Sequence, residues 1–227
     1  MKKKIKIKFE HVTYFGKPIV NVRDYFLSMT YLFDEFDFIL SDKPDFVITN
    51  KAIPKGPYTR IYINPENVRP PINHAEWLFG PDYEEDINCR NYRRQPNYVK
   101  LGAGTDLIDV KKNIDIHKIL KEKTKFCAFI YANPVPIRND FFYMLSKYKR
   151  VDSPGVCCNN MRNIGNYSNC QTSRMRKTFC DEVIQFLKPY KFVIAFENSS
   201  YPGYCSEKIY HPMLVNTIPI YWGNPKI

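Results

Sequence analysis

Two cationic side chains in the C-terminal half of the chain stand where loops are expected to lead into helices. Arg138 follows Tyr131–Ile137 (YANPVPI), a proline-containing segment at the end of an apolar run. Lys208 lies two residues after Ser206, a residue type that often caps a helix N-terminus. A guanidinium can grip a phosphate with two hydrogen bonds, and a helix start attracts anions. The structural alternatives are a helix-start arginine and a surface lysine paired with Glu207.

Acidic and amide side chains offer further chemistry. Glu197 and Asn198 follow the apolar run Lys191–Phe196 (KFVIAF), and either could hydrogen-bond a sugar hydroxyl, a ribose or merely the turn backbone. The segment Tyr83–Asp86 (YEED) places three carboxylates in a basic chain. Clustered carboxylates raise one another's pKa, which suits a general base. A solvated acidic loop is the alternative.

Several expected motifs are missing from the sequence. No Asp-x-Asp, G-x-x-x-x-G-K-[ST], G-x-G-x-x-G or G-x-S-x-G pattern occurs, which disfavours ATP-driven chemistry, dinucleotide oxidoreduction and serine hydrolysis. The seven cysteines form no C-x-x-C pair and the four histidines are scattered, so the spacing predicts no zinc site.

The charge balance is strongly basic. Thirty-four Lys and Arg against 23 Asp and Glu give 227 residues a formal net charge of +11, which attracts anionic partners or simply improves solubility. The basic residues are spread without a known nucleic-acid motif, so no nucleic-acid partner is predicted. No run approaches the roughly 18 apolar residues of a transmembrane segment, and no apolar signal region follows the first lysines. The sequence predicts a cytoplasmic protein, with room for peripheral membrane association.

The N-terminal half has an α/β pattern. Alternation predicts a strand over Met1–Phe9, with Ile5, Ile7 and Phe9 on one face. The segment Val22–Phe38 is typical of a helix, or of a helix followed by a short strand. Further strands are predicted over Asp45–Thr49, Thr59–Ile63 and Trp77–Phe79, residues 80–124 are expected to be irregular, and a helix with a linker is expected over Asp115–Lys125.

The C-terminal half alternates strands and helices more regularly. The predicted strands are Lys125–Tyr131, Arg150–Asp152, Lys191–Phe196 and Ile218–Trp222, and the predicted helices are Asn139–Tyr148, Ser173–Leu187 and Ser206–Val215. Such alternation favours a parallel sheet with right-handed crossovers. Ligands of such sheets bind beyond the carboxyl ends of the strands, here at Tyr131–Arg138, Glu197–Lys208 and after Trp222.

The last forty residues carry an ordered set of motifs. Phe196–Ser199 (FENS), Tyr204–Lys208 (YCSEK) and Pro219–Gly223 (PIYWG) follow one another. This string resembles the signature of the family 10 glycosyltransferases, the α-1,3-fucosyltransferases, in its bacterial-type form. Looser similarity extends upstream through Tyr131–Asn139, Tyr92–Pro96, Tyr83–Glu85 and Tyr62–Val68.

The resemblance implies an α/β fold of the GT-B type with two Rossmann-like domains, the second incomplete. Residues 1–124 would form the acceptor-side domain and residues 125–227 the domain that binds GDP-fucose. The implied reaction is inverting transfer of L-fucose from GDP-fucose to a hydroxyl of a glycan acceptor, for instance one that contains N-acetylglucosamine.

The resemblance also implies roles for single residues. The catalytic base maps to Glu85, with Glu84 and Asp82 close enough to confuse the alignment. Arg138 and Lys208 map to the contacts of the departing diphosphate, and the other nucleotide-sugar contacts map to Asn133, Asn198, Tyr204 and Glu207. Two cations can stabilise the leaving diphosphate, so no metal cofactor is required.

Two departures from the family pattern lead to further expectations. Pro212 falls inside the last predicted helix, which should kink or shorten after Tyr210. The chain stops at Ile227, where a GT-B domain normally continues. The alternative function is therefore a catalytically dead remnant that binds a nucleotide sugar or a glycan.

Overall fold

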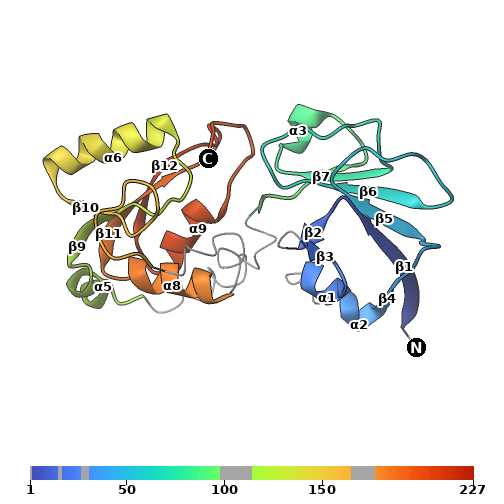
Figure 1. The fold of residues 1–227 in the computed structure, drawn as a ribbon, viewed down its shortest axis with the longest axis horizontal. Coiled ribbons are helices and arrows are strands. Elements are labelled where there is room, and N and C mark those ends of the chain that lie inside the picture. The colour runs from blue at the N-terminus through green and yellow to red at the C-terminus, as the bar shows by residue number, and fades with distance from the viewer. Residues whose placement is uncertain (1, 15–16, 27–30, 98–113, 165–176) are drawn as a thin grey trace. The chain divides into compact units, whose positions relative to one another are not determined.

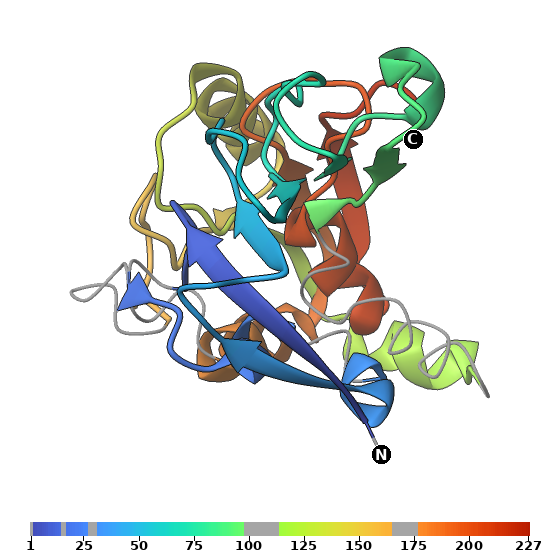
Figure 2. The same ribbon diagram turned by 90° about the vertical axis from the view of Figure 1, so that its right-hand side faces the viewer.

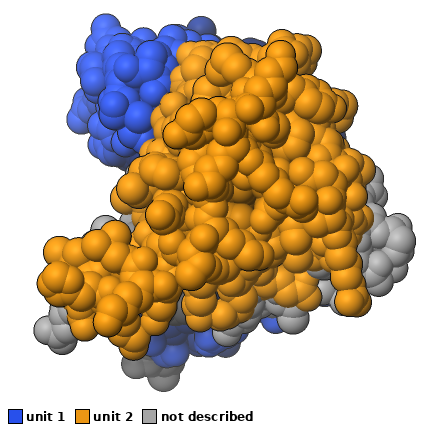
Figure 3. Space-filling view, turned by 90° about the vertical axis from the view of Figure 1, so that its left-hand side faces the viewer, with its two compact units in different colours: residues 1–103, 201–205, 224–227 blue, residues 104–200, 206–223 orange. Residues whose placement is uncertain are grey.

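The computed structural model describes residues 2–14, 17–26, 31–97, 114–164 and 177–227. The chain divides into two compact units, coloured separately in Figure 3. Unit 1 comprises residues 1–103, 201–205 and 224–227, and unit 2 comprises residues 104–200 and 206–223. The first change of unit comes at 103/104, earlier than the predicted 124/125, and two short C-terminal segments join unit 1. The functional assignment of the two domains stays a prediction.

Unit 1 is built on a parallel sheet of six strands in the order β4-β1-β5-β6-β7-β8. The strands are β1 (Lys3–Glu10), β4 (Phe36–Leu40), β5 (Phe46–Thr49), β6 (Thr59–Ile63), β7 (Trp77–Gly80) and β8 (Tyr92–Arg94). A separate antiparallel pair joins β2 (Thr13–Tyr14) to β3 (Lys17–Pro18). The sheet is followed most easily in Figure 2.

The alternation of β1 decides which face of this sheet is buried. Ile7 is 2% exposed and packs with Val22 of α1 (Val22–Tyr25) and Phe33 of α2 (Leu32–Glu35). Ile5 and Phe9 lie against the same cluster, as predicted. Both helices lie beside β1 and β4 in Figure 1.

Two segments of unit 1 differ from expectation in detail. The segment predicted over Val22–Phe38 contains two four-residue helices and then the start of β4, which is closest to the second alternative. The segment 80–124, predicted as irregular, contains α3 (Glu84–Ile87) and β8 in unit 1. Elements of three or four residues carry too little periodicity to be found from sequence, although Tyr92 in β8 is fully buried.

Unit 2 is built on a parallel sheet of four strands in the order β10-β9-β11-β12. The strands are β9 (Lys125–Ala128), β10 (Val151–Asp152), β11 (Tyr190–Phe196) and β12 (Ile218–Trp222), and the helices are α5 (Ile116–Glu122), α6 (Pro136–Tyr148), α8 (Lys177–Leu187) and α9 (Glu207–Leu214). Part of the helix predicted over Ser173–Leu187 lies outside the described residues.

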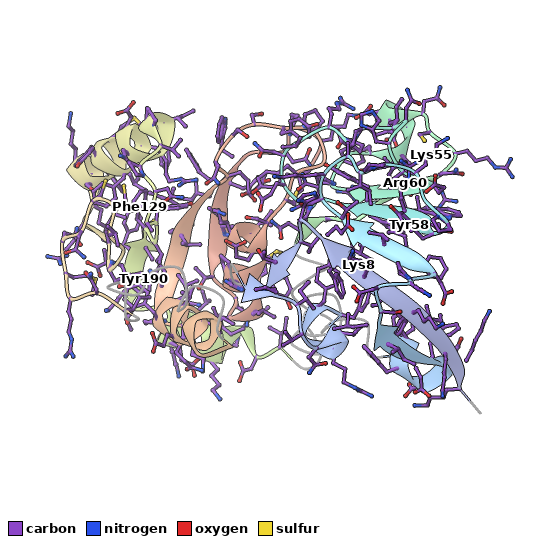
Figure 4. All side chains as sticks on the ribbon, turned by 45° about the vertical axis from the view of Figure 1, so that its right-hand side comes forward. Lys8, Lys55, Tyr58, Arg60, Phe129 and Tyr190 are labelled. Carbon is purple, nitrogen blue, oxygen red and sulfur yellow. The ribbon has the colours of Figure 1, made fainter. Side chains whose placement is uncertain are left out.

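Both faces of the unit 2 sheet are covered. Phe129 and Ile194 belong to the core cluster that contains Phe142 of α6. Tyr190 belongs to the cluster that contains Leu187 of α8. Figure 1 shows α6 and α8 on opposite sides of this sheet, and Figure 4 labels Phe129 and Tyr190. A strand buried on both faces explains why β11 is a nearly continuous apolar run.

The helix α9 corrects one prediction. It continues through Pro212 to Leu214, so the expected shortening after Tyr210 is wrong. Pro212 removes one backbone donor from an eight-residue helix, and its carbonyl accepts hydrogen bonds from Val215 N (3.1 Å) and Thr217 N (2.9 Å). The helix α6 is longer than predicted. It begins at Pro136, three residues before the predicted start, because proline is favoured in the first turn of a helix.

No helix in the part of the chain that the structure describes is long and apolar enough to span a bilayer.

Candidate functional site

Arg138 lies in the first turn of α6 and is 1% exposed. Its Nη1 donates to Asn133 O at 3.3 Å, and its Nη2 donates to Phe196 O at 3.1 Å and to Asn198 Oδ1 at 2.9 Å. Its Cζ lies 3.8 Å from the centroid of the Tyr131 ring. The sequence left a phosphate clamp and an ordinary helix-start arginine open. The side chain is a buried cation at the carboxyl end of β11.

The ring of Tyr131 packs against the Arg138 guanidinium. Its hydroxyl donates to Ile194 O and accepts from Phe196 N, both at 2.7 Å. Burial raises the pKa of the Tyr131 hydroxyl, which keeps it protonated. The ring under Arg138 is therefore fixed to the backbone of β11.

Lys208 is the second residue of α9, and the Ser206 side chain caps this helix as predicted. The Lys208 Nζ lies 3.0 Å from Ser206 Oγ, 3.1 Å from Glu207 Oε1 and 3.5 Å from Glu197 Oε2. Burial disfavours the ammonium, but Glu207 and Glu197 outweigh this effect and raise the pKa of Lys208. The predicted pairing with Glu207 is present, yet the side chain is only 19% exposed and is not a solvated surface lysine.

Glu197 lies at the centre of this arrangement and its side chain is fully buried. Its Oε1 accepts from Ser206 N at 2.7 Å, and both of its carboxylate oxygens lie within 2.9 Å of Ser206 Oγ. Burial raises the pKa of Glu197, although Lys208 and Ser206 oppose the shift. The sequence left open a hydrogen bond from Glu197 to a ribose, to a sugar hydroxyl or to backbone. The structure shows the contact to backbone, at Ser206 N.

Glu207 and the two amides complete the group in unit 2. Burial works against the Glu207 carboxylate, but Lys208 and His211 together lower its pKa. Arg138 donates to Phe196 O and Asn198 Oδ1, and the Lys208 Nζ lies 3.5 Å from Glu197 Oε2, so both cations contact the three consecutive residues at the end of β11. Five of the seven predicted site residues thus share this unit, namely Asn133, Arg138, Asn198, Glu207 and Lys208.

The other two predicted residues lie in unit 1. Glu85 is exposed in the short helix α3. Tyr204 is 2% exposed, and its hydroxyl donates to Glu66 Oε2 at 3.4 Å. Their roles at the site stay predictions.

Sequence reasoning missed a buried carboxylate in unit 1. Asp82, considered only as a possible confusion with Glu85, is 1% exposed. Its Oδ1 accepts from Tyr201 OH at 2.9 Å and lies 3.2 Å from Arg69 Nη1. Burial raises the pKa of Asp82 against these two contacts. Its partners are 13 and 119 residues away, so no local pattern could have found it.

The sequence analysis also did not pair Glu197 with Lys208. A signal was available, because a carboxylate at the end of a strand precedes a serine N-cap in the same motif. No three His, Cys, Asp or Glu side chains gather as metal ligands among the described residues.

Comparisons with known proteins find a family match over the C-terminal part of the chain. Residues 120–227 match the family model described as Glycosyltransferase family 10 (fucosyltransferase) C-term. The chain is 36% identical over 197 residues to the α-(1,3)-fucosyltransferase FucT of Helicobacter pylori, which covers 74% of this chain and 38% of that protein. It is 37% identical over 90 residues to α-(1,3)-fucosyltransferase B of Drosophila melanogaster, covering 40% of this chain and 20% of that protein.

A relative with another name also matches. The chain is 32% identical over 96 residues to GDP-fucose protein O-fucosyltransferase 3 of Bos taurus, covering 42% of this chain and 19% of that protein. The chain thus spans between a fifth and two fifths of the length of these three relatives.

A solved structure shows the fold. The crystal structure of an α1,3-fucosyltransferase with GDP-fucose superimposes with a TM-score of 0.72 at 22% identity, covering 100% of this chain and 70% of that one. Together with the two parallel α/β sheets, this likeness confirms the predicted GT-B fold class.

Proposed function

We propose that the chain, whose residues 120–227 match the glycosyltransferase family 10 model, is a member of that family and transfers L-fucose from GDP-fucose to an acceptor hydroxyl. One observation carries the proposal: Arg138 and Lys208, which are 1% and 19% exposed, contact adjacent residues at the end of β11 in unit 2, Arg138 through Phe196 O and Lys208 through Glu197 Oε2. A pair of preplaced cations suits a leaving group that gains negative charge as its bond to a sugar breaks.

In the proposed step, Glu85 takes the proton of the acceptor hydroxyl as general base. The acceptor oxygen forms a bond to C1 of fucose while the bond from C1 to the β-phosphate oxygen breaks. GDP leaves with the electron pair, and the configuration at C1 inverts. Arg138 and Lys208 neutralise the charge that develops on the diphosphate.

The remaining predicted contacts complete the proposal. Asn133, Asn198, Tyr204 and Glu207 would bind the nucleotide sugar. Residues 125–227 would form the donor domain and residues 1–124 the acceptor side. Because the two cations supply the charge that a metal otherwise provides, transfer should persist in the presence of a chelator.

The proposal includes two classes of acceptor. A glycan with N-acetylglucosamine is the predicted class, and two relatives are named for an α-(1,3) linkage. The relative named as a protein O-fucosyltransferase makes a polypeptide hydroxyl the second class to test. The cytoplasmic location is likewise a prediction.

The test combines GDP binding by calorimetry with fucose transfer to both acceptor classes. Lys208→Met should weaken GDP binding about tenfold or more, while Lys191→Met, which changes an exposed lysine of the same unit, should not. Glu85→Gln should abolish transfer and keep GDP binding. An intact GDP affinity in Lys208→Met would contradict the proposed site. GDP binding without transfer to any acceptor would instead favour the binding remnant.

A further inference from the structure

The Glu197 carboxylate has no role in the function proposed above, yet it lies against the cation that function uses. Its side chain is 0% exposed, and its Oε2 is 3.5 Å from Lys208 Nζ. Burying a carboxylate is unfavourable unless it is paired and hydrogen-bonded. Ser206 and Lys208 supply the hydrogen bonds and the opposite charge that this burial requires. A neutral side chain would avoid the cost of burying a charge, so the presence of a carboxylate here calls for an explanation.

The backbone at the end of β12 also holds Glu197 in place. Glu197 N donates to Trp222 O at 2.7 Å, which ties the residue to the end of β12. Gly223 follows, and a Cβ at that position would lie 2.5 Å from Glu197 Cγ. The Glu197 side chain therefore already fills the space beside Gly223 that a larger residue would need, and from there its carboxylate contacts Ser206 at the start of α9.

Lys208 has the longer side chain of the pair, with more rotatable bonds to order than Glu197. A free lysine side chain samples many rotamers, and ordering it on binding costs affinity. Here the Nζ already contacts Ser206 Oγ at 3.0 Å, Glu207 Oε1 at 3.1 Å and Glu197 Oε2 at 3.5 Å, and of the two carboxylates only Glu197 is fully buried. Because Glu197 also holds the Ser206 side chain, one carboxylate orders both the helix cap and the ammonium.

We infer that Glu197 is a positioning residue that holds the Lys208 ammonium at the start of α9 for the diphosphate of the donor. This inference rests on the proposed function. The carboxylate has two opposite effects on GDP affinity. It orders the ammonium before GDP binds, which strengthens binding, and it competes with the diphosphate for the ammonium, which weakens binding. We expect the ordering effect to be the larger one.

A double-mutant cycle on GDP affinity tests the inference. The variants are Glu197→Gln, Lys208→Met and the double variant, with Glu182→Gln as the matched control because Glu182 is exposed on α8. Glu197→Gln keeps the shape of the side chain and should weaken GDP binding about five- to tenfold. In the Lys208→Met background the same change should have less than a twofold effect, because its target is gone. Glu182→Gln should bind GDP like the wild type.

A ligand-free measurement is independent of GDP. The ¹⁵N signal of the Lys208 ammonium can be assigned by its loss in Lys208→Met. It should shift or disappear in Glu197→Gln and stay unchanged in Glu182→Gln. If thermal melting shows that Glu197→Gln does not fold, Glu197→Asp serves instead, because it keeps a buried charge but withdraws it from Lys208, and it should give the same losses.

Three results would overturn the inference: tighter or unchanged GDP binding by Glu197→Gln, multiplicative effects in the cycle, or an unchanged Lys208 signal. Tighter binding would mean that the carboxylate only competes with the diphosphate. A wild-type chain that does not bind GDP would overturn the proposed function itself and this inference with it.

Discussion

The guanidinium of Arg138 stacks on the ring of Tyr131, with 3.8 Å between Cζ and the ring centroid. The Tyr131 hydroxyl is bound to Phe196 N, and the Arg138 Nη2 is bound to Phe196 O. Two side chains from the segment after β9 therefore use both backbone groups of the last residue of β11. This relationship fixes the cation before any ligand arrives.

Removing the Tyr131 hydroxyl should destabilise unit 2. In Tyr131→Phe the buried Phe196 N–H and Ile194 C=O lose their partner, which should cost about 1–3 kcal/mol. Urea unfolding followed by tryptophan fluorescence measures this cost, and a Trp77→Phe background leaves Trp222 of unit 2 as the reporter. Tyr148→Phe is the control, since Tyr148 is 81% exposed. Equal midpoints for the two variants would contradict the role of the hydroxyl.

Replacing Arg138 by lysine should keep the positive charge but lose the stacking and the hydrogen bonds of the guanidinium. A lysine ammonium is compact and cannot stack on Tyr131 while donating to both Phe196 O and Asn198 Oδ1. We expect Arg138→Lys to lose about 2–3 kcal/mol of stability and to weaken GDP binding. The same fluorescence assay and calorimetry measure the two effects. Retention of wild-type stability and GDP affinity would show that only the charge at this position matters.

Much of the fold follows from residue patterns. The strands β6 and β12 have the predicted bounds, because each is a short run rich in β-branched and aromatic residues. The N-cap at Ser206 was also predicted, since a serine precedes a helical pattern. The failures have physical reasons: α3 and β8 are too short for periodicity, and α9 tolerates Pro212 because only one backbone bond is at stake.

The sequence singled out individual residues of the candidate site but did not predict the contacts between their side chains. Loop position and resemblance singled out Arg138 and Lys208, which both belong to unit 2, and their roles stay predictions. The environment of Arg138 depends on Phe196 and Asn198, which are 58 and 60 positions away. No local pattern encodes such pairs. The division that gives Tyr204 to unit 1 is a property of tertiary packing and was invisible in the motif.

Adding one methyl group at Gly223 should disturb the Glu197 carboxylate. The new Cβ would lie 2.5 Å from Glu197 Cγ and 2.7 Å from Tyr221 OH, well inside van der Waals contact. Overpacking of this kind typically costs about 1–3 kcal/mol. Gly223→Ala should therefore lower the urea midpoint of unit 2 and weaken GDP binding together. A variant with full stability and full affinity would show that the Glu197 side chain can move aside.

Acid should weaken unit 1 through one ion pair on β6. Arg60, labelled in Figure 4, donates from Nε and Nη2 to the two oxygens of Glu76 at 3.0 and 2.7 Å. The hydrogen bond from Arg60 is the largest cause that lowers the pKa of Glu76 to about 2. In the unfolded chain this carboxyl titrates near 4.5, so between about pH 4.5 and pH 2 the unfolded state binds more protons. The stabilisation is therefore complete above about pH 4.5 and is lost as the pH falls toward 2.

The variant Glu76→Gln isolates this contribution. Because the Glu76 side chain is 41% exposed, solvent screens the pair, and we expect a loss of about 1 kcal/mol near pH 7. The difference in unfolding free energy between wild type and variant should shrink from pH 6 to pH 3. Trp77 reports unit 1 in a Trp222→Phe background, and Glu35→Gln, an exposed change in the same unit, controls for the substitution itself. A difference that stays constant over this range would show that the pair does not respond to acid as its geometry requires.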